Sequence, residues 1–239
     1  DGDTWLPGEC DVSIRPGWFY HPREDHQLKS LSRLIDIYYE SVGRNANLLL
    51  NFPVDRSGRI APADSARIME WRRALDAEFA HDLLAEAQAT ADNVRGGARR
   101  FSAAKAVDGR ADTYWATDDG VTAATLSLQF ERPRRVNRIL LQEYIPLGQR
   151  VGRFAVEWLD GDTWRPVETA EEMTTIGYKR IIRFAGVTTP ALRVRFGQAR
   201  GPLCISNVEA YDAPVLLEEP RIVRNGAGEV TLAAGDTQA

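Results

Sequence analysis

The chain has 239 residues, of which 44% are hydrophobic and 27% charged, a composition typical of a globular protein with one large or two medium domains. Its formal net charge of −4 gives no general attraction for nucleic acid or an anionic membrane. Its longest apolar run, "NLLLNF", is far too short to span a bilayer, so we expect neither nucleic acid nor a membrane as partner.

The first window, "DTWLPGECDVSIRPGWFYHP" (3–22), combines tryptophans, carboxylates and an arginine. We interpret it as a strand with its following loop, where functional groups gather in an α/β barrel. A tryptophan ring can cover the C–H face of a sugar, while carboxylates and a guanidinium can hydrogen-bond its hydroxyls. The alternative is structural, with the aromatic rings in a core and Arg15 paired with Glu9 or Asp11. The candidate sugar contacts are Trp5, Glu9, Asp11, Arg15 and Trp18.

Residues 27–42 have apolar residues at helical spacing, and Gly43 follows in the position of a C-cap glycine. Residues 45–54 contain Leu48, Leu49 and Leu50 in succession, which predicts a strand buried on both faces. Asn51 then either anchors the strand end by hydrogen bonds or lines a pocket. A second helix is predicted after Pro62, over 63–84, with its apolar residues on one stripe.

This strand–helix–strand–helix pattern is incomplete as a domain, because a parallel pair of strands leaves both outer edges bare. A (β/α)₈ barrel takes about 250 residues. We therefore predict that residues 1–85 are the C-terminal portion of such a barrel and that the chain is the C-terminal part of a larger protein.

The composition changes after residues 86–92, which we expect to be a linker. Residues 93–213 contain short runs of alternating polarity separated by Gly, Pro and Asp, which predicts an antiparallel β-sandwich. Residues 214–239 are expected to begin a further β domain that is truncated. The predicted sandwich strands are 125–130, 136–144, 153–159, 163–168, 179–184, 191–196 and 205–211.

The strings "WLPGECDVSIRPGWFYHPRED", "LKS" and "SVGRNANLLLNFPVDRSGRI" resemble the C-terminal part of the catalytic barrel of glycoside hydrolase family 29, the α-L-fucosidases. The resemblance covers residues 1 to about 80 and is greatest to the subgroup that cleaves α-1,3/1,4 linkages in branched, Lewis-type glycans. It implies a retaining mechanism with an Asp nucleophile and a Glu acid/base.

In that subgroup both catalytic motifs lie upstream of the quoted strings, and neither occurs in this chain. The resemblance therefore implies no catalytic residue here. Glu9 is an alternative acid/base, because other branches of the family have a Glu in a similar Trp-Glu-x-Cys position. The preferred expectation is that Glu9, Arg15 and Trp18 hold the fucose or its neighbouring sugar, with Trp18 near the fucose methyl group.

The strings "FSAAKAVDGRADTYWAT" and "VNRILLQEYIPLGQRVGRFAVEW" resemble a discoidin-type (coagulation factor type C) sandwich, also called carbohydrate-binding module family 32, a galactose-binding, jelly-roll-like fold. Related sandwiches hold a structural calcium here, for which Asp108, Asp112 and Thr113 are the candidates; the alternative is a metal-free hydrogen-bonded turn. Trp115 is expected in the core. The loop 142–150 is expected to pack between domains, or else to face a glycan.

The expected function is therefore that of a C-terminal fragment of a retaining exo-α-L-fucosidase acting on fucosylated oligosaccharides, inactive by itself and without a catalytic cofactor. The alternative is a non-catalytic glycan-binding or adhesion protein built on the sandwich. Because fucosylated glycans are extracellular, a secreted or periplasmic location is expected.

Overall fold

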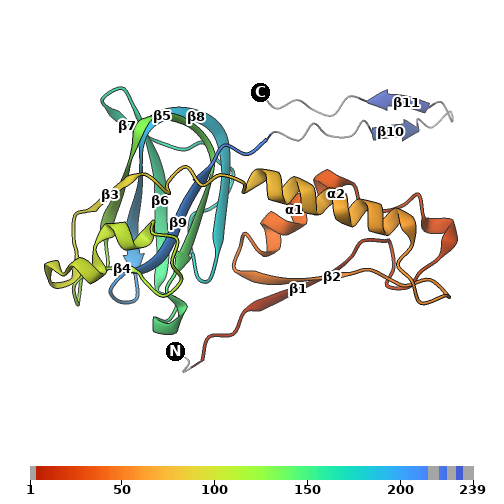
Figure 1. The fold of residues 1–239 in the computed structure, drawn as a ribbon, viewed down its shortest axis with the longest axis horizontal. Coiled ribbons are helices and arrows are strands. Elements are labelled where there is room, and N and C mark those ends of the chain that lie inside the picture. Colours follow the sequence, from red (N-terminus) through yellow and green to blue (C-terminus); the bar gives the residue numbers. More distant parts are fainter. Residues whose placement is uncertain (1–3, 215–220, 225–229, 234–239) are drawn as a thin grey trace. The chain divides into compact units, whose positions relative to one another are not determined.

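The computed structural model describes residues 4–214, 221–224 and 230–233 (Figure 1). The chain forms two compact units, each assembled from separate segments. The first, which we call the sheet unit, comprises Asp1–Cys10, Tyr39–Leu48 and Glu78–Ala213. The second, the helical unit, comprises Asp11–Tyr38, Leu49–Ala77 and Pro214–Ala239.

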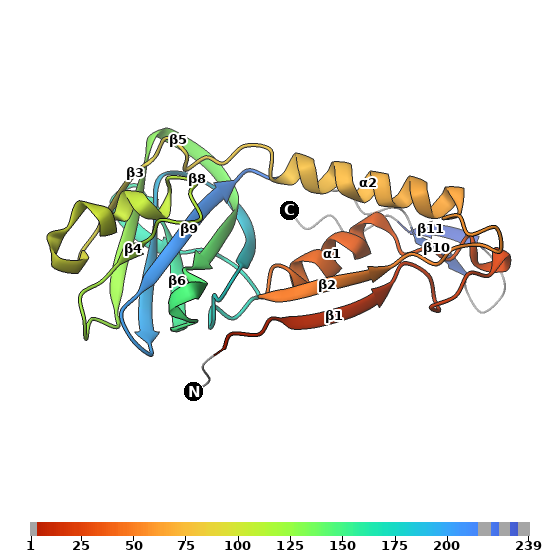
Figure 2. The same ribbon diagram turned by 60° about the horizontal axis from the view of Figure 1, so that its bottom comes forward.

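The first 80 residues contain the predicted alternation of strands and helices: β1 (Gly8–Ser13), α1 (Leu31–Ser41), β2 (Ala46–Asn51) and α2 (Pro62–Glu78), with a short 3-10 helix at Pro22–Glu24. The strands β1 and β2 form a two-stranded sheet and run in the same direction (Figure 2). The residue after α1 that must be glycine is Gly43, because a Cβ there would lie 2.5 Å from the carbonyl oxygen of Tyr39.

Three details of this region differ from the sequence-based expectations. The first helix begins at Leu31, after the predicted start at 27. The second helix ends at Glu78, several residues before the predicted end at 84. Leu49 is 52% exposed, so β2 is not buried on both faces within the described part of the chain. Among the described residues β2 pairs with β1, and the exposed Leu49 shows that one face of this pair is uncovered there.

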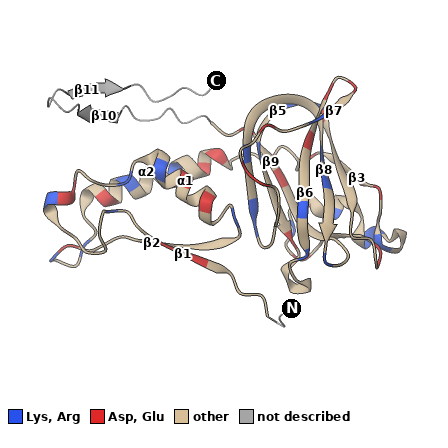
Figure 3. Cartoon of the chain, turned by 180° about the vertical axis from the view of Figure 1, so that it is seen from behind, with Lys and Arg blue, Asp and Glu red and all other residues tan. Residues whose placement is uncertain are grey.

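Charged residues of both signs lie along α2 (Figure 3). Ion pairs at helical spacing join Arg67 to Glu70 at 3.2 Å and Arg72 to Asp76 at 2.8 Å. Such exposed pairs contribute little each. The helix is therefore positioned by its partly buried stripe of Ile68, Trp71 and Leu75.

The sheet unit contains a seven-stranded antiparallel sheet with the order β4-β9-β5-β8-β6-β7, and β3 pairs with β5. An antiparallel β domain is thus confirmed. The sheet bends over itself through β5 and β8 (Figure 1) and encloses one hydrophobic core. The strands are β3 (Gln88–Ala91), β4 (Trp115–Ala116), β5 (Ala124–Glu143), β6 (Val151–Asp160), β7 (Thr163–Pro166), β8 (Arg180–Ala199) and β9 (Cys204–Tyr211).

Four of the predicted strands are halves of two long ones. The predicted strands 125–130 and 136–144 both belong to β5, and 179–184 and 191–196 both belong to β8. Register shifts near Gln129 and Val136 accommodate Pro133 without ending the strand. A proline at a bulge removes no ladder hydrogen bond, so it did not divide β5 as the sequence pattern suggested.

The predicted linker 86–92 is wrong for most of its length. Residues Gln88–Ala91 form β3, whose residues pair with Leu126–Gln129 of β5. Ala89 and Ala91 pack against the core, whereas Gln88 and Thr90 face solvent. Small apolar residues at alternate positions of a short edge strand gave too weak a signal for the strand to be recognised.

Trp115 lies in the core, as predicted. Its side chain is fully buried, and its Nε1 donates to the carbonyl oxygen of Asn93 at 2.9 Å. Beyond the sheet unit, β10 (Arg221–Arg224) and β11 (Val230–Ala233) pair in antiparallel fashion. The remainder of the predicted further β domain lies outside the described residues. No helix in the described ranges is long and apolar enough to cross a membrane.

Candidate functional site

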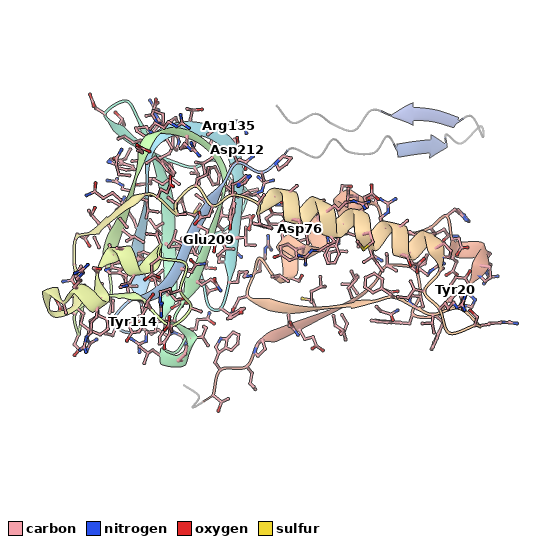
Figure 4. All side chains as sticks on the ribbon, viewed as in Figure 1. Tyr20, Asp76, Tyr114, Arg135, Glu209 and Asp212 are labelled. Atoms are coloured by element: carbon pink, nitrogen blue, oxygen red, sulfur yellow. The ribbon has the colours of Figure 1, made fainter. Side chains whose placement is uncertain are left out.

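The loop after β1 is organised around a buried arginine. Arg15 is fully buried, and its Nε and Nη2 donate to the two carboxylate oxygens of Asp64 at 2.9 and 2.6 Å. Nη2 also donates to Asp25 at 2.7 Å, and the Tyr20 ring lies 4.6 Å from the guanidinium carbon (Figure 4). The hydrogen bond to Asp64 is the main cause of a raised Arg15 pKa, which burial opposes.

The ion-pair partner of Arg15 corrects the sequence-based interpretation. Neither Glu9 nor Asp11 pairs with it; Asp64, in the first turn of α2, does. A carboxylate in that position is also favoured by the helix dipole. Because the guanidinium is enclosed and bonded on all sides, Arg15 shapes the loop and has no surface left for a sugar.

Asn51 acts as the strand-end anchor. Its Nδ2 donates to the carbonyl oxygen of Trp18 at 3.0 Å and to Ser13 Oγ at 3.1 Å. Ser13 Oγ in turn donates to the carbonyl oxygen of Gly17 at 2.7 Å. These bonds hold the backbone of the loop, while the Trp18 side chain remains 50% exposed. Trp18 is therefore presented to solvent on a well-supported loop.

The other three predicted sugar contacts lie on or before β1, and Trp18 lies after it. Glu9 and Asp11 are exposed on alternate positions of β1, and Trp5 precedes that strand while Trp18 follows it. Trp5 and Glu9 belong to the sheet unit, whereas Asp11 and Trp18 belong to the helical unit. The Trp5 indole instead donates to Gln149 Oε1 at 3.3 Å.

At the loop end of the sheet unit, Glu143 is buried and accepts three backbone hydrogen bonds. Its Oε1 accepts from the N–H groups of Arg150 at 2.6 Å and Val151 at 2.9 Å, and its Oε2 accepts from Gly177 at 2.7 Å. Burial raises the pKa of this carboxyl, and the three N–H groups oppose that shift. Glu143 thus fixes the loop 145–150 and the turn at Gly177.

A tyrosine pair stacks beside this loop. The rings of Tyr114 and Tyr144 have centroids 4.3 Å apart and planes at 19°, and Phe101 packs on Tyr114 at 5.5 Å (Figure 4 labels Tyr114). Both tyrosines are partly exposed. The sequence showed each tyrosine next to a predicted loop, but it gave no sign that the two loops meet. A hollow of about 260 Å³ is lined in part by Gln142, Tyr144, Tyr178, Ser206 and Asn207.

The calcium candidates form a hydrogen-bonded turn. Asp108 accepts from the Thr113 hydroxyl at 2.7 Å and from Lys105 Nζ at 2.9 Å, while Asp112 pairs with Arg110 at 2.9 Å. Both carboxylates are thus already bonded to cationic side chains, so these residues as arranged do not fit a hard cation that needs six or more oxygen ligands. Calcium binding at this turn stays a prediction.

Comparison with known proteins identifies the sheet domain. The sequence pattern of the F5/8 type C domain matches residues 87–209, about half of the chain. The chain belongs to the F5/8 type C domain family. The match begins inside the predicted linker, in agreement with β3 as the first strand of the F5/8 type C domain.

Similarity to known proteins extends beyond the F5/8 type C domain. Alpha-L-fucosidase 1 of Arabidopsis thaliana is 34% identical over 88% of this chain and 41% of the relative. A glycoside hydrolase family 29 fucosidase of Ruminococcus gnavus, solved with fucose, has a TM-score of 0.82 and 32% identity, covering 90% of this chain and 43% of that one. A family 29 member from an unknown rumen bacterium has a TM-score of 0.71 and 35% identity, covering 90% and 34%.

The chain spans about two fifths of the length of the curated relatives it matches. The resemblance to the C-terminal part of family 29 proteins, followed by an F5/8 type C domain, is therefore confirmed.

The Arg15–Asp64 pair should be strongly coupled. Asp64→Ala leaves a buried guanidinium without its main partner and should lower the free energy of unfolding by about 3–5 kcal/mol. Arg15→Ala should be similarly costly, and the double variant should cost much less than the sum. Urea unfolding of the wild type, the two single variants and the double variant measures this coupling. As a control, Asp25→Asn changes a half-exposed partner of Arg15 and should lower the free energy of unfolding by about 1 kcal/mol or less. Additive single effects would contradict the coupling.

Glu143 should make stability fall with rising pH. Its folded-state pKa is raised above the ordinary 4.5, so folding takes up a proton just above that pH, and the associated stability is lost as pH rises through the folded pKa. Glu143→Gln should be less stable but should show a flatter pH dependence above 4.5 than the wild type. Urea unfolding at several pH values tests this, with exposed Glu131→Gln as the control; equal slopes in wild type and Glu143→Gln would refute it.

Proposed function

We propose that this chain is the C-terminal part of a retaining exo-α-L-fucosidase that removes terminal α-L-fucose from fucosylated, Lewis-type glycans. The supporting observation is its similarity to the R. gnavus fucosidase, whose structure contains fucose, over 90% of this chain. That similarity must include the helical unit, because the F5/8 type C domain accounts for only about half of the chain.

Retaining hydrolysis needs two carboxyl groups about 5–5.5 Å apart, one to attack the anomeric carbon and one to protonate the leaving oxygen. In this proposal the Asp nucleophile and the Glu acid/base are supplied by residues of the parent protein that precede Asp1, on the remaining strands of a (β/α)₈ barrel. The strands β1 and β2 would then be members of that barrel.

The contribution of this chain to the sugar site would come from the loop after β1. Trp18 offers a half-exposed aromatic face, which suits the apolar methyl side of a fucose. Arg15, Asp64 and Asn51 hold the loop that carries it. Glu9 and Asp11 are exposed and could accept hydroxyl hydrogen bonds, but they lie farther back along β1.

Two acids of the sheet unit, the partly buried Asp82 and the buried Glu143, have pKa values raised by desolvation, as catalytic acids commonly do. Their oxygens nevertheless accept backbone N–H groups, Asp82 from Leu84 and Ala210 at 2.9 and 3.0 Å. Because they are bonded within the fold, we propose no catalytic role for them. No catalytic cofactor is part of the proposal, and the location of the parent protein would be extracellular or periplasmic, where fucosylated glycans occur.

A second candidate function is glycan binding by the F5/8 type C domain itself. The supporting observation is the hollow beside Tyr144, which combines a partly exposed aromatic ring with the amides of Gln142 and Asn207. Aromatic faces with a few placed polar groups are what a saccharide site requires. This function would be compatible with the first.

The 239-residue chain should give no turnover of an activated fucoside such as 4-nitrophenyl α-L-fucoside, whereas the full-length protein that contains it should hydrolyse the substrate. A folded full-length protein without activity would contradict the fucosidase proposal. Turnover by the chain that is lost in Glu9→Gln, but kept in Glu131→Gln, would place the acid/base at Glu9 and overturn our assignment.

Glycan binding should depend on Tyr144. Titration of the chain with fucosylated and galactosylated oligosaccharides should shift NMR signals of the hollow, and Tyr144→Ala should weaken binding about tenfold, the order expected for loss of an aromatic contact. Trp164→Ala, at the far edge strand β7, is the control. Absence of binding to any of these sugars would leave the domain with a structural role only.

A further inference from the structure

The side-chain amide of Gln149 joins two segments that are distant in sequence. Its Oε1 accepts one hydrogen bond from Trp5 Nε1 at 3.3 Å and another from Asn45 Nδ2 at 3.2 Å. Trp5 lies shortly before β1, and Asn45 lies immediately before β2. One oxygen of the F5/8 type C domain therefore bonds to the segment before β1 and to the segment before β2.

Asn45 and Gly177 fit each other closely. Asn45 has a φ of +67°, a left-handed conformation that asparagine tolerates better than most residues. Its Oδ1 accepts from the N–H of Tyr178 at 2.6 Å. Gly177 has a φ of +66°, and a Cβ there would lie 2.3 Å from Asn45 Nδ2. The amide of Asn45 thus fills the space that a side chain at residue 177 would need.

An aromatic contact accompanies these hydrogen bonds. The rings of Trp5 and Tyr178 are 6.1 Å apart at 41°. A short stretch of backbone pairing lies next to them. The N–H of Ile181 donates to the carbonyl oxygen of Gly43 at 2.9 Å, and the backbones of Arg44 and Arg180 form an isolated antiparallel β-bridge. Hydrogen bonds, a ring contact and backbone pairing therefore all hold the segment around residues 43–45 against the same part of the F5/8 type C domain.

Glu143 fixes the part of the F5/8 type C domain that contacts Trp5 and Asn45. Its carboxylate binds the N–H groups of Arg150 and Gly177, the neighbours of Gln149 and Tyr178. The loop and the turn that hold Trp5 and Asn45 are therefore fixed from within the F5/8 type C domain. A rigid acceptor loses little conformational entropy when it is used.

We propose that Gln149, Gly177 and Tyr178 form a docking surface for two segments of this same chain, the one before β1 and the one before β2. Gln149 is the positioning residue, and it acts through its single acceptor oxygen, Oε1. The F5/8 type C domain then holds the segments that lead into β1 and β2. This inference goes beyond the proposed function and does not depend on it.

The indole N–H of Trp5 reports on the contact directly. The chain has six tryptophans, so a proton–nitrogen NMR spectrum should show six indole signals, and Trp5→Phe identifies the one from Trp5. In Gln149→Ala, hydrogen exchange at the Trp5 indole should accelerate about tenfold, as expected for loss of one hydrogen bond. The amide of Tyr178 should exchange faster as well, because Asn45 loses a support.

A conservative variant separates an acceptor role from general packing. Gln149→Glu keeps an oxygen that can accept from both Trp5 and Asn45, so slow exchange should be restored, whereas Gln149→Lys offers only donors and should behave like Gln149→Ala. Gln129→Ala, whose amide donates to the carbonyl oxygen of Pro190, is the matched control and should leave the Trp5 signal unchanged.

Wild-type exchange at Trp5 in Gln149→Ala would overturn the proposal, as would a failure of Gln149→Glu to restore protection. Should Gln149→Ala fail to fold, Trp5→Phe gives the reciprocal test, since it keeps a ring against Tyr178 and removes only the donor. The Asn45 side-chain amide should then shift, and an unchanged Asn45 signal would equally refute the shared acceptor.

Discussion

The carboxylate of Glu143 is the interaction on which the loop end of the F5/8 type C domain depends. A buried carboxylate is costly unless its oxygens are hydrogen-bonded, and here three backbone N–H groups from two separate segments satisfy them. The positions of Tyr144, Gln149 and Tyr178 follow from that convergence, since each adjoins Glu143 or one of its donors. The tyrosine stack, the hollow and the Gln149 contacts would all lose their geometry without it.

The helical unit has an analogous centre in Arg15 and Asp64. Buried ion pairs are weak evidence for stability, because desolvation offsets most of the Coulomb energy. Their geometry is nevertheless demanding, since a guanidinium fork accepts a carboxylate in few orientations. The pair therefore ties the loop after β1 to the start of α2, and Asn51 ties the same loop to the end of β2. In both units, a charged group inside the fold gives the exposed aromatic residues a defined place.

The sequence was sufficient for the order of the elements. Periodicity predicted both helices, β2 and the antiparallel domain, and Trp115 was placed in the core. Pairing between distant residues could not be predicted from the sequence, because nothing near Arg15 indicated that a carboxylate 49 residues later would be its partner. The sequence window around β1 also gave no sign that it crosses a boundary between two compact units, with Trp5 in the sheet unit and Trp18 in the helical unit. Likewise β3 is too short, and too poor in large apolar residues, to be recognised without its partner β5.

The interlocking of Asn45 with Gly177 has a consequence for how this architecture can be divided or recombined. A fragment cut just before the F5/8 type C domain would retain Gly177 and Tyr178 but lose Trp5 and Asn45, which would leave the space beside Gly177 empty and remove the ring contact of the already exposed Tyr178. If the domain were grafted onto another protein, that protein would need an asparagine, or a similar short amide side chain, in a left-handed backbone conformation at the position equivalent to Asn45. A segment that keeps this contact is thus wider than residues 87–209, and a domain replacement should carry both sides of the contact together.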